Sequence, residues 1–367
     1  MPSAQKIKSL IGLAKGLPLT YFGGKKKLFP WLAPLLAREM SGAETVLDGF
    51  CGSGIISALL TQLGLRVFSC DMLESAHCLT VTLAQNPGEV LASEDLDFLC
   101  SHRCVDGTLL EGDDAIPLAD PVASRFPHVL TSNESLWLAR TVQKLEGFSP
   151  FKRLQGLAAI RGLTCLIPFG AANVRDTYRQ RISQKDKFGT HCLGHYLNSS
   201  YEFELEEWFR RYVDKLGTSV GRLTAGRTHD ATVFRGDIIP VLGMGWAKRV
   251  DVAYFDPPYG GNRKQDYTRR FALSECVLGA SPVLAAAFSR PTGHERSLRL
   301  LLEAASQIPK VIFSYDSSSW TNIEKIVDVI EGSGRRVRVE SVEHAHGKVG
   351  LKSSQKAVTE SLIIGER

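Results

Sequence analysis

Short apolar runs alternate with longer amphipathic segments along this chain of 367 residues. The apolar runs are typical of buried strands, and they lie at residues 46–48, 65–71, 250–255 and 311–315. Two further runs, at residues 336–342 and 358–364, predict a terminal hairpin. Helical spacing predicts helices at residues 55–60, 134–147, 151–167, 201–216 and 321–332. Strands that alternate with helices in this way predict an α/β sheet.

The same pattern divides the chain. Helices occupy the middle, whereas the strands lie on both flanks. We therefore predict that residues 1–80 and 230–367 form one sheet domain, and that residues 81–229 are inserted into it as a second, mainly helical domain. A length of 367 residues suits this division.

The most informative polar residues follow the strand at 250–255. The segment Asp256-Pro257-Pro258-Tyr259 places an acid, a rigid carbonyl and an aromatic ring at the mouth of the sheet, because the prolines stop the strand. The carboxylate and the Pro257 carbonyl can accept hydrogen bonds from an exocyclic amine, and Tyr259 can stack on the ring that carries it. An enzyme that extrudes a nucleobase would hold the base in this way. A Pro-Pro turn beside a buried aromatic ring is the simpler alternative.

A Gly-rich turn follows the strand at 46–48. Its sequence is Asp48-Gly49-Phe50-Cys51-Gly52-Ser53-Gly54, and its glycines let the backbone approach a ligand at the start of a helix. The spacing is neither the dinucleotide fingerprint nor a phosphate loop. The next strand ends in Asp71, where an α/β nucleotide site binds a ribose hydroxyl. An ordinary βαβ unit is the alternative for this segment.

A third stretch, Tyr21-Phe22-Gly23-Gly24-Lys25, combines two glycines with a lysine run. Alone it would predict a solvated helix start, although its lysines can pair with a carboxylate. Together and in this order, the three stretches resemble the motifs of the D12 class of DNA N6-adenine methyltransferases, the Dam-type, alpha-group enzymes. A weaker fourth match is Phe234-Arg235-Gly236-Asp237-Ile238. The resemblance covers about residues 18–75 and 230–367.

The resemblance implies a class I, Rossmann-like fold that moves a methyl group from S-adenosylmethionine to N6 of a flipped adenine in double-stranded DNA. It implies the catalytic residues Asp256, Pro257, Pro258 and Tyr259. It implies a cofactor site formed by Tyr21, Phe22, Gly23, Gly24, Lys25, Asp48, Phe50, Cys51, Gly52, Ser53, Gly54, Asp71, Asp237 and Ile238. In this set Asp71 is expected at the ribose, Asp237 near the adenine, and Lys25 and Tyr21 near the methionine end.

Basic residues are concentrated in the middle of the chain. Residues 152–227 contain 13 Lys and Arg against 7 Asp and Glu, although the formal net charge of the whole chain is only +5. Arg, Lys, Asn, Gln, Tyr and Phe are interleaved there, and such side chains contact phosphates and read base edges. We therefore predict DNA contacts by Asn173, Arg175, Tyr178, Arg179, Arg181, Lys185, Lys187, Arg263 and Lys264. A solvated basic loop is the alternative.

Composition argues against a membrane protein, a secreted protein and a metal-binding protein. No stretch reaches the roughly 18 apolar residues of a membrane helix, and residues 1–15 lack the apolar block of a signal peptide. The Cys and His clusters at 100–104 and 191–195 lack paired ligand spacing, so we predict free intracellular thiols and no metal. We expect a cytoplasmic enzyme, encoded by a bacterium, an archaeon or a phage, that acts on double-stranded DNA as a monomer. A cognate restriction endonuclease or defence system is a candidate partner.

Other functions fit parts of the pattern. N4 of cytosine presents a similar amine, although by resemblance its enzymes more often carry Ser in place of Asp256. Adenine in RNA is a further acceptor. A catalytically silent DNA-binding subunit is a different class of protein, and the intact Asp256, Tyr259 and Gly-rich turn argue against it. Methyl transfer to DNA separates these alternatives.

Overall fold

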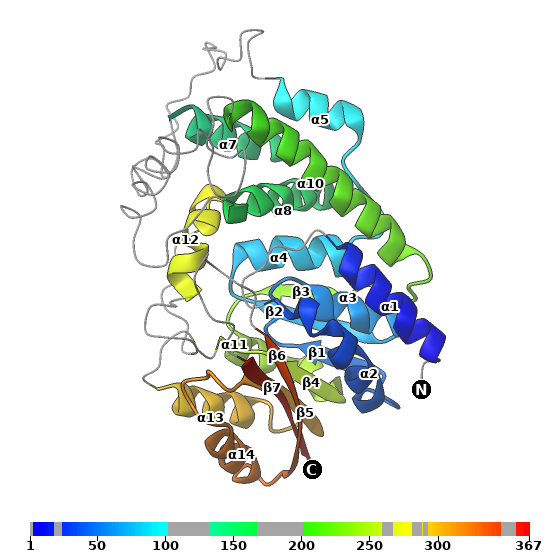
Figure 1. The fold of residues 1–367 in the computed structure, drawn as a ribbon, viewed down its shortest axis with the longest axis vertical. Helices are drawn as coiled ribbons and strands as arrows, with labels where there is room; N and C mark the ends of the chain where they lie inside the picture. The colour runs from blue at the N-terminus through cyan, green and yellow to red at the C-terminus, as the bar shows by residue number, and fades with distance from the viewer. Residues whose placement is uncertain are drawn as a thin grey trace.

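The computed structural model describes residues 3–17, 24–101, 132–166, 201–258, 267–280, 288, 293–345 and 357–367. Its centre is a seven-stranded sheet in the order β3-β2-β1-β4-β5-β7-β6 (Figure 1). The strands are β1 (Thr45–Asp48), β2 (Arg66–Asp71), β3 (Thr232–Arg235), β4 (Val252–Phe255), β5 (Lys310–Asp316), β6 (Arg336–Ala345) and β7 (Ala357–Glu366). Pairing is parallel from β3 through β5, whereas β7 is antiparallel to both β5 and β6. A mixed α/β fold with a mainly parallel sheet is therefore confirmed.

Helices cover both faces of the sheet, because successive side chains of its central strands point to opposite faces. In β1, Val46 belongs to one core cluster and Leu47 to the other. The first cluster includes α1 (Ala4–Gly16), α2 (Phe29–Glu39), α3 (Ile55–Gln62) and α4 (Glu74–Thr80), which continues into a π-helical turn, η2 (Val81–Gln85). The second includes α11 (Ile238–Leu242), α13 (His294–Ala304) and α14 (Ile323–Glu331).

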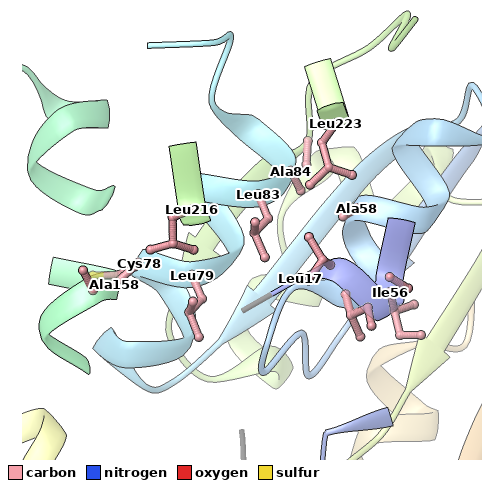
Figure 2. Packing of buried hydrophobic residues seen from close by; sticks show 14 of the residues in the cluster. Leu17, Ile56, Ala58, Cys78, Leu79, Leu83, Ala84, Ala158, Leu216 and Leu223 are labelled. Atoms are coloured by element: carbon pink, nitrogen blue, oxygen red, sulfur yellow. The ribbon is translucent and has the colours of Figure 1, made fainter. Parts of the chain in front are cut away.

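Further helices extend the first layer. These are α5 (Ser93–Cys100), α7 (Ser132–Leu145), α8 (Pro150–Leu166), α10 (Tyr201–Thr224) and α12 (Tyr267–Val277). In Figure 1, α7, α8 and α10 lie beyond α4, on the side away from α13 and α14. Figure 2 shows Ala158 of α8 beside Cys78 of α4, and Leu223 of α10 beside Ala84 of η2. The helices between β2 and β3 thus share one apolar core with the sheet, and a separate domain at residues 81–229 stays a prediction.

Most predicted elements occur, with shifted ends. The helix predicted at 201–216 continues to Thr224, because Val220 and Leu223 extend its buried face. The helix predicted at 321–332 begins at Ile323, since the Asn322 side chain accepts the Lys325 N–H and caps it. The predicted terminal hairpin is confirmed by the antiparallel pairing of β6 with β7. Among the described helices, none combines the length and apolarity that crossing a membrane requires.

Candidate active site

The connections of the sheet change direction between β1 and β4. From β1 the chain moves outward to β2 and β3, and it then forms β4 and β5 on the other side of β1. Ligands of open α/β sheets bind outside the carboxyl ends of the strands at such a switch point. Asp48 ends β1, and Asp256 directly follows β4. Both acids therefore lie at the edge where a ligand is expected.

Two glycines shape the turn that leaves β1. A Cβ atom on Gly49 would lie 2.5 Å from the Phe255 ring, so a larger residue would not fit against β4. Gly54 has a φ of +73°, and a Cβ atom on it would lie 2.8 Å from the Thr80 Cα. The turn therefore packs closely against both β4 and α4, and it holds the N-terminus of α3 at the same edge of the sheet.

Asp71 closes this turn from the side of β2. Its Oδ2 accepts the Gly52 N–H at 2.9 Å, and its Oδ1 accepts the Leu73 N–H at 3.0 Å. Burial raises the pKa of Asp71 to about 6, although the two backbone hydrogen bonds favour its charged form. The carboxylate is thereby fixed at the carboxyl end of β2.

An open pocket with an empty volume of about 290 Å³ lies beside Asp71. It is lined by Gly49, Phe50, Asp71, Met72, Gly236, Asp237, Ile238 and Phe288. The rings of Phe50 and Phe288 meet edge to face, with centroids 5.3 Å apart. Asp237 accepts the Ile239 N–H at 3.0 Å and caps α11. The walls combine flat apolar groups with two carboxylates, which suits a ligand that has a ring together with hydroxyl or amino groups.

Asp48 is fully buried at the end of β1. Its Oδ2 accepts a hydrogen bond from Ser57 Oγ at 2.6 Å, whereas its Oδ1 has no hydrogen-bond partner among the described residues. Burial raises the pKa of Asp48 to about 7 against that hydrogen bond, and the negative charges of Asp256 and Asp71 add to the rise. This buried Oδ1 atom could therefore accept a hydrogen bond from a ligand or contact a positive charge on it.

Lys25 lies between two carboxylates. Its Nζ is 2.9 Å from Asp256 Oδ1 and 2.9 Å from Glu360 Oε1. Ser314 Oγ donates to the same Glu360 oxygen at 2.5 Å. The side chains of Lys25 and Glu360 are 6% and 3% exposed, whereas that of Asp256 is 18% exposed. Asp256 is therefore the member of this cluster that a ligand can still reach.

The surroundings of Asp256 alter its acidity. Burial raises the pKa of Asp256 to about 7, although the ion pair with Lys25 opposes the rise. The negative charges of Glu360 and Asp316 act in the same direction as burial. A carboxyl group whose pKa lies near neutral pH can accept a hydrogen bond or a proton from a bound substrate.

The structure brings the predicted cofactor residues into two groups. Phe50, Asp71, Asp237 and Ile238 line the pocket. Lys25 instead contacts Asp256, and Gly24 precedes it at the start of a 3-10 turn, η1 (Lys25–Lys27). The remaining residues of the turn, which are Cys51, Gly52, Ser53 and Gly54, do not line the pocket, and the Cys51 sulfur accepts a hydrogen bond from Thr80.

Several predictions fall elsewhere. Pro257 and Pro258 follow Asp256 beyond β4. Outside the described residues lie Tyr21, Phe22, Gly23, Tyr259, Asn173, Arg175, Tyr178, Arg179, Arg181, Lys185, Lys187, Arg263 and Lys264. Cys100 is buried, as are Cys51, Cys70, Cys78 and Cys276.

Motif reasoning missed Glu360, Ser314, Met72 and Phe288. For Glu360 a signal was present, since it is the one charged residue of the strand predicted at 358–364. Its partner was not readable, because the register that sets Glu360 opposite Asp316 joins distant segments of the chain. Met72 directly follows Asp71, and Phe288 belongs to no motif.

Comparisons with known proteins show which proteins this chain is similar to. A family model described as D12 class N6 adenine-specific DNA methyltransferase matches residues 21–98. The chain is 22% identical over 354 residues to the protein described as Type II methyltransferase M2.HphI, from Haemophilus parahaemolyticus. That similarity covers 95% of this chain and 97% of the relative. No solved structure matches the chain.

Proposed function

Because the chain belongs to the D12 class of N6 adenine-specific DNA methyltransferases, we propose that it methylates adenine in DNA at the carboxyl ends of β1 and β4. The observation that carries this assignment is the position of Asp256. Its carboxylate stays partly exposed at the switch point of the sheet, beside Lys25. The nearby pocket has aromatic and carboxylate groups that suit a nucleoside. Asp256 and the two prolines that follow it thereby lie where we expect the target base to enter.

S-adenosylmethionine, the methyl donor that the family implies, supplies a methyl group on a positively charged sulfur when it is bound. The residues at hand fit such a group. Asp71 would accept hydrogen bonds from ribose hydroxyls, while Phe50 and Ile238 would flank the adenine ring and Asp237 its amine. The unpartnered oxygen of Asp48 would face the cationic part of the donor.

The chemistry at Asp256 follows from the weak nucleophilicity of an exocyclic amine. The lone pair of adenine N6 is delocalised into the ring. Hydrogen bonds from N6–H to the Asp256 carboxylate and the Pro257 carbonyl would localise that pair as the new C–N bond forms. Tyr259 would stack on the extruded base. The methylated amine is then cationic and acidic, so it gives up a proton to Asp256 or to water.

The remaining assignments concern DNA. We propose that residues 81–229 form the target-recognition region and that the basic residues named above contact the duplex. The relative is described as a type II methyltransferase. By analogy, the chain would protect DNA next to a cognate endonuclease, and one monomer would serve each target adenine.

The test is methyl transfer by the purified chain to DNA of mixed sequence, with an isotopically labelled donor. Chromatography of the product nucleosides should show the label in N6-methyl-2′-deoxyadenosine. Label in N4-methylcytosine, or transfer to RNA alone, would replace this proposal by one of the alternatives. Binding of DNA without any transfer would identify a silent subunit. Calorimetry with the donor alone measures its affinity independently of turnover.

A further inference from the structure

A second carboxylate stands behind Asp256. Glu360 belongs to β7, and β7 reaches the site by pairing with β5, which places Glu360 opposite Asp316. The Glu360 side chain is 3% exposed and shares the Lys25 ammonium with Asp256, each at 2.9 Å. Because Ser314 donates to the same Glu360 oxygen, the position of that oxygen is set from two sides.

Stability alone does not account for this glutamate. Lys25 and Asp256 already form an ion pair. Bringing another carboxylate out of water beside them costs free energy, and a neutral or apolar residue commonly fills such a buried position at no loss. The cluster of Lys25, Asp256 and Glu360 has one positive and two negative side chains when all are ionised, and the excess charge is negative.

We propose that Glu360 is a positioning residue for methyl transfer, which acts through Lys25. This inference rests on the proposed function. By sharing the ammonium, Glu360 holds it at Asp256 Oδ1 and weakens the ion pair that Asp256 would otherwise form alone. The second Asp256 oxygen is then a strong acceptor for the amine of the target base.

The excess negative charge also matches the reaction. As the lone pair of N6 forms the C–N bond, the methyl–sulfur bond breaks and its electron pair stays on sulfur. The positive charge therefore moves from sulfur to N6, which lies against Asp256. A negative cluster at Asp256 favours this movement, because the charge is closer to it in the transition state than in the ground state. The proton of the new cation then leaves to Asp256 or water.

The groups around Asp256 fix the sign of the expected pH effect. Facing it are Lys25 of η1, Glu360 of β7, Asp316 and Tyr315 of β5, Tyr254 of β4 and Asp48 of β1. Glu360→Gln removes one negative charge and one of the carboxylates that share Lys25 with Asp256. Both changes lower the pKa of Asp256. The low-pH limb of the rate profile should therefore move to lower pH in this variant.

The experiment measures single-turnover methyl transfer against pH for the wild-type chain and for Glu360→Gln. The rate at neutral pH should fall about tenfold, the size expected for losing one charge-assisted contact. The donor dissociation constant from calorimetry should stay within about threefold. Glu366→Gln is the matched control. It removes an ion pair with Lys310 from the other end of the same strand, and it should keep the wild-type rate and pH profile.

A readout without turnover makes the test independent of the reaction. Carbon-13 NMR of the carboxyl groups, with Asp256→Asn to identify the signal, should show Asp256 titrating at lower pH in Glu360→Gln. Should that variant fold poorly, Ser314→Ala loosens Glu360 without removing its charge, and it should lower the transfer rate by less than Glu360→Gln does.

Two failures are distinguishable. If wild-type protein transfers no methyl group to DNA, the proposed function is wrong, whatever the NMR titration shows. If the wild type is active but Glu360→Gln keeps its rate, its pH profile and the Asp256 titration, Glu360 is only a structural residue and the inference is overturned.

Discussion

Buried glutamates at opposite ends of the same sheet have opposite surroundings. Glu39, at the end of α2, contacts Arg338, Arg38 and Lys310 near the amino end of β5. Glu360, near the carboxyl end of β5, shares Lys25 with Asp256. Burial would raise the pKa of Glu39, but hydrogen bonds from Arg338 and Arg38 outweigh it and lower that pKa. At the other end, the pKa values of Asp256 and Asp48 rise to about 7.

The difference in charge balance distinguishes a cluster that stabilises the fold from one that serves the proposed reaction. The Glu39 carboxylate contacts three cationic side chains, which compensate its negative charge. These contacts also join α2 to β5 and β6. Around Asp256 the carboxylates exceed the cations among the described contacts, which costs stability. Such a cost is typical of sites whose uncompensated charge serves a ligand or a transition state.

The largest expected effect is on turnover. Asp256→Ala should reduce methylation by about a thousandfold or more, because it removes the proposed acceptor of the target amine. Donor and DNA affinities should change little. Asp256→Asn should keep a trace of activity, since its amide oxygen still accepts one hydrogen bond. Single-turnover assays measure both.

Asp251 offers a control at the other end of the same strand. It precedes β4, and its Oδ2 accepts the N–H groups of Glu44 and Thr45. Asp251→Asn should lower the melting temperature slightly and leave turnover intact. If the two aspartate-to-asparagine changes had equal effects on turnover, the assignment of Asp256 to catalysis would be untenable.

The second effect is on the pH dependence of stability. Asp48, Asp256 and Asp71 have folded-state pKa values above the ordinary one, so the folded state holds more protons than the unfolded state between about pH 4 and 7. Stability without ligand should therefore fall as the pH rises through that window. Asp48→Asn should remove at most about 3 kcal/mol of the decline between about pH 4 and 7.

Thermal unfolding at constant ionic strength measures this slope. Glu39→Gln is the control, because the lowered pKa of Glu39 keeps that group ionised above about pH 5, and its contribution is lost only as the pH falls further. Equal slopes for Asp48→Asn and the wild type would contradict the raised pKa of Asp48.

A third effect is the loss of stability at the amino end. Glu39→Gln should destabilise the fold by about 2 kcal/mol, since hydrogen bonds to a charged group are lost while the half-exposed arginines can be rehydrated. The rate of methylation by the folded variant should not change. Urea unfolding measures the stability of the variant, and a turnover assay measures its methylation rate. A variant that lost activity while keeping its stability would contradict the assignment of Glu39 to the stability of the fold.

The smallest effect is on the donor site. Asp71→Ala should raise the dissociation constant of S-adenosylmethionine by about tenfold, the loss expected for a charged hydrogen bond to ribose. Isothermal titration measures it. Asp237→Ala should weaken binding as well, and it should also loosen α11, which Asp237 caps. Unchanged affinity in Asp71→Ala would remove Asp71 from the donor site.

Local pattern was enough to predict every strand of the described sheet except β3, together with the terminal hairpin and the acids at the ends of β1, β2 and β4. Buried strands and Gly-rich turns have signatures within a few residues. The pairing of Lys25 with Asp256 and Glu360 could not be read in this way, because it joins η1, β4 and β7, and depends on the register of β5 with β7. Phe288 could not be predicted as part of the pocket wall either, because it is distant in sequence from the other residues of that wall.

The place of β7 has a consequence for how the protein is made. β7 follows every other strand in the sequence, yet β6 reaches the sheet only through it. Until residues 357–366 have left the ribosome, neither the outer strand nor Glu360 can take its place. A nascent chain could therefore form the pocket, whose wall comes from the segments after β1, β2 and β3 together with Phe288, before Lys25 and Asp256 gain Glu360 as a partner. The proposed reaction centre would therefore be completed after the pocket beside it.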